Sequence, residues 1–179
     1  MKRTVLMPTL TAAKNVDIYN ASFISETDDL DNGSVFTKGD LTENGSQVYE
    51  VTKPATGSLS GLWMAFSPED TVITDDAGNQ YKIGINNPQT FTNSKGIVFS
   101  GFKPQVGDLI LMTAEGFSNE IESNTYAVAD NASYKLKFAS AAITGLSFKV
   151  VETSYMSIAG VNAIGSQRVA AYLLECVAN

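Results

Sequence analysis

Short runs in which apolar and polar residues alternate recur along the chain. Residues 48–52 read Val-Tyr-Glu-Val-Thr and residues 134–138 read Tyr-Lys-Leu-Lys-Phe, so every second residue falls on the same face of an extended strand. Residues 62–66 read Leu-Trp-Met-Ala-Phe and are apolar on both faces, which indicates a strand buried on both sides. This pattern predicts β-strands rather than amphipathic helices.

Similar runs predict most of the remaining strands. These lie at residues 21–25, 97–99, 109–113, 125–129, 146–152 and 168–177, with a hairpin over residues 71–86. For two segments a helix is the alternative prediction. Residues 10–16 could form one short helix. In another, one face could be shared by Val169, Leu173, Cys176 and Val177, although we favour a strand for residues 168–177.

Glycine-containing pairs mark the turns between these strands. Asn32-Gly33 and Asn44-Gly45 each precede a strand-like run, which is typical of tight chain reversals. Because glycine adopts positive φ at no steric cost, we expect positive φ at Gly33 and Gly45. Residues 75–79 read Asp-Asp-Ala-Gly-Asn between two apolar pairs, and we interpret them as the turn of the predicted hairpin.

Strand spacing predicts the fold class. Short strands recur every 10 to 15 residues or so with Gly, Asn and Asp in the turns, which favours an all-β protein, a mostly antiparallel barrel or sandwich with little helix. Residues 1–15 are small, polar and weakly patterned, and we expect an extended N-terminal arm ordered only by contact with something else. Residues 16–102 would form a first β half and residues 103–179 a second. The halves would share one core or pack as two small subdomains.

Charge and hydropathy argue against two classes of partner, nucleic acids and membranes. The chain has 19 acidic and 12 basic residues, a net charge of −7, so its surface repels phosphate backbones and we do not expect nucleic acid as a partner. No segment approaches the roughly 20 apolar residues of a membrane span, so we expect no membrane partner either.

The residue inventory argues against an enzyme. The chain has no histidine and one cysteine, Cys176, which removes the usual general base, the His-dependent nucleophiles and practically every zinc site. Cys176 lies in an apolar run and is expected to be a buried small hydrophobe. Residues 28–33 fail as a calcium loop because Leu30 takes a ligand position, and residues 57–61 lack the lysine of a phosphate loop. We therefore expect no catalytic, metal-binding or cofactor-binding residues.

Four segments carry a resemblance to a known family. They are Leu-Asp-Asn-Gly-Ser-Val-Phe at 30–36, Val-Tyr-Glu-Val-Thr-Lys-Pro at 48–54, Leu-Trp-Met-Ala-Phe-Ser-Pro-Glu at 62–69 and Val-Gly-Asp-Leu-Ile-Leu-Met-Thr at 106–113. In this order they resemble the head (capsid) decoration proteins of tailed bacteriophages. The resemblance spans about residues 28–115.

The resemblance implies a structural role without catalysis. Such a protein binds the major capsid protein on the outer face of the assembled head, stabilises the head and commonly self-associates as a trimer. It would be made in the host cytoplasm and reside on the capsid exterior of the virion. The alternative is a sugar- or receptor-binding β module of a phage tail or cell surface, in which Trp63 or an exposed tyrosine would stack on a ligand. Because Trp63 is flanked by Leu62 and Met64, we expect it in the core instead.

The N-terminal arm is the expected anchor to the shell. Several weak contacts on one oligomer multiply into stable attachment, and strand pairing with apolar burial is less sensitive to salt than attachment by charge. Removal of residues 1–15 is therefore expected to leave the β domain folded and to lower occupancy on heads.

We predict that Trp63→Ala lowers the free energy of unfolding by about 3–5 kcal/mol, because it empties a buried aromatic site. Denaturant or thermal unfolding of the two proteins measures this loss. A loss below about 1 kcal/mol would contradict the placement of Trp63 in the core.

Overall fold

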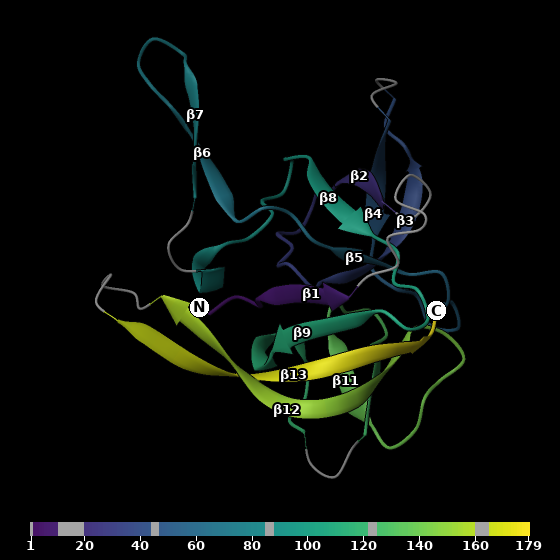
Figure 1. Cartoon of the computed structure of the whole chain (residues 1–179). Coiled ribbons are helices and arrows are strands. Elements are labelled where there is room, and N and C mark those ends of the chain that lie inside the picture. Colours follow the sequence, from purple (N-terminus) through teal and green to yellow (C-terminus); the bar gives the residue numbers. More distant parts are fainter. Residues whose placement is uncertain (1, 11–19, 44–46, 85–87, 122–124, 160–164) are drawn as a thin grey trace.

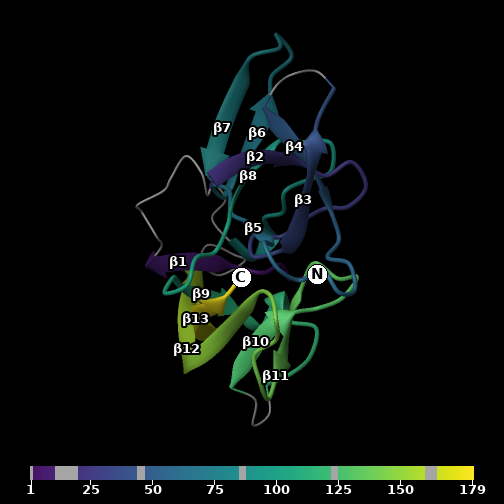
Figure 2. The same ribbon diagram turned by 90° about the vertical axis from the view of Figure 1, so that its right-hand side faces the viewer.

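The fold is built almost entirely from strands, which confirms the predicted all-β class (Figures 1 and 2). The computed structural model describes residues 2–10, 20–43, 47–84, 88–121, 125–159 and 165–179. Within these ranges the helical elements are two 3-10 turns, η2 (Pro88–Thr90) and η3 (Ala114–Gly116). The strands form a closed barrel, a six-stranded sheet and a separate hairpin.

The barrel is formed by five strands in the order β2-β4-β3-β5-β8. Its strands are β2 (Asn20–Ile24), β3 (Val35–Leu41), β4 (Val48–Thr52), β5 (Trp63–Ala65) and β8 (Phe99–Phe102). β2 and β4 are parallel, and the other neighbours are antiparallel. Closure leaves this sheet without a free edge.

The six-stranded sheet is antiparallel throughout, in the order β1-β9-β13-β12-β10-β11. Its strands are β1 (Leu6–Leu10), β9 (Leu109–Thr113), β10 (Tyr126–Ala129), β11 (Leu136–Ala139), β12 (Ser147–Ala159) and β13 (Ser166–Ala178). β12 and β13 extend beyond β9, where they pair only with each other among the described strands, as Figure 1 shows.

The predicted hairpin is present as β6 (Asp70–Thr74) and β7 (Gln80–Gly84). The Asp75 carboxylate shapes the turn by accepting hydrogen bonds from the backbone N–H groups of Ala77 (3.0 Å) and Asn79 (2.8 Å). In Figure 1 the hairpin stands away from the barrel and the sheet. Residues 75–79 are thus a turn, as the sequence predicts.

The described part of the N-terminus belongs to the fold. β1 pairs with β9, and Thr4, Val5 and Leu6 are buried. The Val5 N–H donates to Thr113 Oγ1 (3.0 Å), and Arg3 forms an ion pair with Asp31 (3.2 Å). The expectation that residues 1–15 are ordered only by contact with something else is therefore wrong for residues 2–10, because Val5 and Leu6 supply apolar side chains that the core buries. Residues 1 and 11–15 lie outside the described ranges.

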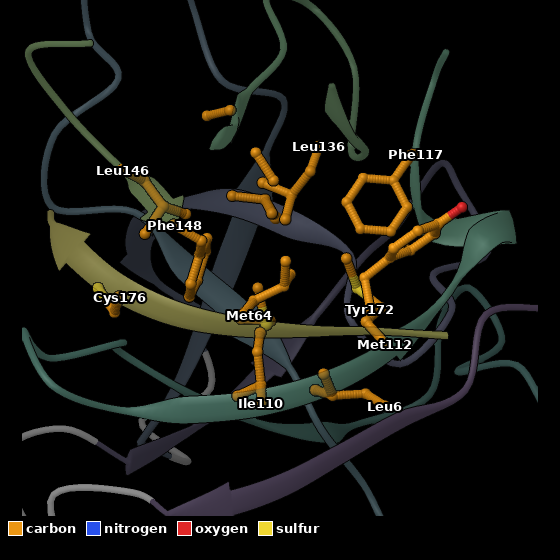
Figure 3. Close-up of a cluster of buried hydrophobic side chains, with 14 of the residues drawn as sticks. Leu6, Met64, Ile110, Met112, Phe117, Leu136, Leu146, Phe148, Tyr172 and Cys176 are labelled. Carbon is orange, nitrogen blue, oxygen red and sulfur yellow. The ribbon is translucent and has the colours of Figure 1, made fainter. Parts of the chain in front are cut away.

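One large core is shared by the barrel and the sheet. Val35, Leu62 and Met64 from the barrel half pack with Ile110 and Phe148 from the sheet. Figure 3 shows the side chains gathered over β9 and β13, with Phe117 and Tyr172 side by side. Aromatic geometry tightens this core, because the rings of Phe117 and Phe138 stack at 4.1 Å and Tyr172 meets both edge-on.

A second cluster fills the barrel. Phe23 lies at its centre, with ring centroids 4.8 Å from Phe36 and 5.1 Å from Trp63, and Phe99 packs beside them. Trp63 is only 7% exposed, which confirms its predicted place in the core and removes it as a sugar-stacking platform.

Gly33 has the positive φ that the sequence predicts, +89°. A Cβ at this position would lie 2.8 Å from Met112 Sδ, so a side chain here would also collide with β9. Residues 44–46 lie outside the described ranges, and with them the same prediction for Gly45.

Several strand limits differ from the sequence-based ones. Ile97 and Val98 were expected in a strand but are 62% and 53% exposed and precede β8, which begins at Phe99. β12 continues seven residues past the predicted end at residue 152, to Ala159. The choice of strand over helix for residues 168–177 is confirmed by β13.

Within β13, Cys176 is fully buried, and burial together with the charge of Asp108 raises the pKa of its thiol to about 12.

We predict that Leu6→Ala lowers the free energy of unfolding by about 2–5 kcal/mol, because Leu6 lies in the shared core. The matched control Val106→Ala, at a site 72% exposed, should change it by less than about 0.5 kcal/mol. Urea unfolding compares the variants. Equal stability of the two variants would show that β1 is a dispensable arm.

Candidate functional site

An apolar groove of about 560 Å³ lies between the sheet and the chain that leaves the barrel. Five parts of the chain line it: Val5 with the start of β1, the segment after β5, one residue each of η2 and β9, and the distal half of β12. The lining residues are Val5, Leu6, Phe66, Ser67, Pro68, Glu69, Pro88, Leu111, Tyr155, Met156, Ser157 and Ile158. Exposed apolar surface gathered in one concave site is typical of a binding site.

Hydrogen bonds fix the wall formed by residues 66–69. The Ser67 N–H donates to Asn32 Oδ1, and Asn32 Nδ2 donates to the Ser67 carbonyl, both at 2.9 Å. Ser67 Oγ accepts from the Ser100 N–H at 2.9 Å, and the Phe66 N–H donates to the Ser100 carbonyl at 3.0 Å. This wall is held by the barrel, and it leaves the Phe66 ring 38% exposed at the groove.

The opposite wall is the distal half of β12, which pairs with β13. Met156 and Ile158 are buried on one face of β12, where they pack with Val5 and Val169. Tyr155, the residue before Met156, also lines the groove and is 52% exposed. The guanidinium carbon of Arg168 lies 4.0 Å from the centroid of the Tyr155 ring, within cation-π distance. One face of Tyr155 is therefore already covered by a cation.

Glu69 places a carboxylate at the apolar groove. It is partly buried, and this burial raises the pKa of its carboxyl above the ordinary value of 4.5. Among the described residues Glu69 has no hydrogen-bond or ion-pair partner. A desolvated carboxylate without a partner is complementary to a cation brought by a bound group.

The edge of β12 beside the groove is open among the described strands. β10 pairs with β12 only as far as Lys149, so residues 151–159 have no described strand on that side, while residues 152–159 pair with β13 on the other side. The stretch reads Val-Glu-Thr-Ser-Tyr-Met-Ser-Ile-Ala and lacks the lysine and proline that usually protect an edge strand. Its main-chain groups can therefore pair with an added strand.

A second, polar hollow lies around Tyr134. Two adjoining spaces of about 420 and 330 Å³ are both lined by Tyr134 and Lys53. The Tyr134 hydroxyl donates to Asp28 Oδ2 at 3.4 Å, and Lys53 Nζ lies 5.3 Å from the ring centroid. Burial, with the charge of Asp28, raises the pKa of Tyr134 to about 12. The Tyr134 side chain is therefore held by its contacts with Asp28 and Lys53.

The three aspartates before Gly33 each contact a different partner and do not converge on one site. Asp28 pairs with Lys53 (3.6 Å), Asp29 accepts from the Lys95 N–H (3.0 Å), and Asp31 pairs with Arg3. No group of three or more potential metal-ligating side chains occurs in the part of the chain that the structure describes.

The sequence did not reveal the groove. Its walls come from residues 66–69 and 155–158, which are far apart in the chain and meet only through the sheet topology. The signal that could have indicated the groove is residues 151–159, a long strand-like stretch without lysine or proline. The predicted strand ended at residue 152 and so left most of this stretch out.

Comparison of the chain with protein-family models, curated proteins and solved structures finds no match. Across the described residues, no helix combines the length and apolar character that crossing a membrane requires.

Glu69→Gln is expected to gain stability relative to the parent as pH rises. The folded parent binds the Glu69 proton more tightly than the unfolded chain does. The carboxyl is protonated in both states well below pH 4.5, so no ionisation penalty arises there; the penalty lowers the free energy of unfolding as pH rises from 4.5 through the raised pKa. The glutamine variant has no such titration. Urea unfolding at several values between about pH 4 and 8 measures the difference, and a difference independent of pH would contradict the burial of the Glu69 carboxylate.

Proposed function

We propose that this chain is a structural decoration protein of a tailed-phage head. It binds the major capsid protein on the outer face of the assembled head, without catalysis. The observation that carries the proposal is the apolar groove with an open strand edge beside it, because such a surface is suited to holding a polypeptide.

The arrangement of the four resembling segments supports this proposal. Residues 48–54 and 62–69 contain β4 and β5, and residues 30–36 end in the first two residues of β3, which lies between β4 and β5 in the barrel. Residues 106–113 supply β9, whose Met112 lies against Gly33. The segments that carry the resemblance are therefore neighbours in space, and residues 66–69 form one wall of the groove.

Attachment through this groove suits an acidic protein. With a net charge of −7, docking by charge alone would be repulsive or strongly salt-dependent, whereas apolar burial and strand pairing persist at raised ionic strength. Self-association as a trimer would multiply a modest affinity per copy. Residues 2–10 contribute to the groove through Val5 and Leu6 rather than as a free arm.

Sugar or receptor binding is the second candidate function. The polar hollow around Tyr134 favours it, because an aromatic ring among charged side chains can contact a sugar. The ion pair of Asp28 with Lys53 occupies part of that hollow.

The test is binding to heads assembled without this chain. The double variant Phe66→Ser and Tyr155→Ser removes both exposed aromatic rings of the groove and should weaken binding at least about tenfold, since buried aromatic anchors carry most interface energy. Val106→Ser, equally apolar-to-polar but outside the groove, should bind like the parent. Raising salt should change parental occupancy little.

Co-sedimentation with heads measures occupancy, and unfolding midpoints confirm that the variants are folded. Full occupancy by the double variant would contradict attachment through the groove. Saturable binding to a glycan array without binding to heads would favour the second function.

A further inference from the structure

We propose that the groove and the open edge of β12 together bind one extended segment of the shell protein, by strand addition. The segment carries apolar residues at alternate positions and a lysine or arginine that faces Glu69. This inference rests on the proposed function and adds the binding mode and the chemistry of the partner segment.

The open edge supplies the main-chain contacts. Residues 152–159 pair only with β13 among the described strands, and at about 3.3 Å per residue they offer an edge roughly 26 Å long. Each second residue along such an edge directs its N–H and C=O groups outward, ready for a new strand. A β-bulge between Val150 and Glu152 separates this stretch from the part that pairs with β10. An added strand would therefore not compete with β10.

The groove selects the side chains. Met156 and Ile158 share the face of β12 that turns toward Val5 and Leu111. In a sheet, neighbouring strands present side chains on the same face side by side, so alternate residues of a strand added at the edge of β12 would lie next to Met156 and Ile158. This is the apolar side of the groove, and Phe66 faces it from the barrel. The added strand thus needs apolar residues at every second position.

Charge identifies the partner. Glu69 is the acidic residue among the groove-lining residues, is partly desolvated and has no partner in the described part of the chain. Glu152 adds a second, exposed carboxylate along the same edge. The nearby Arg168 is engaged with the ring of Tyr155. A basic segment is complementary to this site. A second copy of this chain, with a net charge of −7, would approach it against overall repulsion.

The experiment uses overlapping synthetic peptides that cover the shell protein, tested for binding to the full chain. The peptides that bind should contain an alternating apolar run with a lysine or arginine. Glu69→Gln should weaken their binding about tenfold, and Glu69→Lys should abolish it. Exchange of the basic residue of the peptide for glutamate should restore binding to the Glu69→Lys variant.

A second variant tests the edge itself. Ser157→Lys places a cation on the open strand and should abolish peptide binding, while Thr52→Lys, an exposed strand residue of the barrel, should have no effect. Hydrogen exchange should show new protection of the backbone amides of residues 151–159 when peptide is bound.

Parallel binding to heads separates this inference from the proposed function. Head binding with no peptide bound, or with peptides that bind Glu69→Lys as well as the parent, would overturn the strand-addition mode and leave the decoration role standing. A dimer of the free protein that Ser157→Lys dissociates, with head binding unchanged, would instead assign the groove to a second copy. Loss of head binding by the parent would overturn the proposed function itself.

Discussion

The buried hydrogen bonds of Asn32 hold together the place where the barrel meets the sheet. Its side chain exchanges two bonds with the backbone of Ser67, and it also accepts from Asn93 Nδ2 at 3.2 Å. Both asparagines are almost completely buried, so the loss of a partner would leave an unsatisfied polar group at a cost of about 1–3 kcal/mol. Next to Asn32, Gly33 has positive φ and lies directly against Met112 of β9. One turn therefore fixes the barrel, the sheet and the chain that leaves β5.

The position of the groove follows from this junction. The shared core packs barrel strands on the sheet, and β1 completes the sheet edge beneath them. Residues 66–69 leave the junction as one wall, and the distal half of β12, which pairs with β13, forms the other. Both walls are thus parts of ordered strands or are bonded to them, which preorganises the groove and lowers the entropic cost of holding a partner.

Much of the fold could be predicted from the sequence, because alternation and turn residues are local signals. Residues 48–52 and 134–138 lie in or overlap strands, and Trp63 is buried among the residues that its apolar neighbours indicated. The N-terminus was misjudged because its polar residues conceal Val5 and Leu6, whose burial depends on pairing with β9, more than a hundred residues away. Ile97 and Val98 were misjudged because an apolar pair is not necessarily buried. The groove could not be predicted, since its walls are joined only by the strand order.

An electron cryomicroscopy map of heads decorated with the chain, at a resolution that separates strands, would show whether the groove is the docking site. If the groove holds the shell protein, Phe66, Glu69 and the outer edge of β12 will face the shell, and a strand of the shell protein will continue the sheet beside residues 152–159. A map in which the chain is bound with this groove open to solvent would contradict docking through the groove.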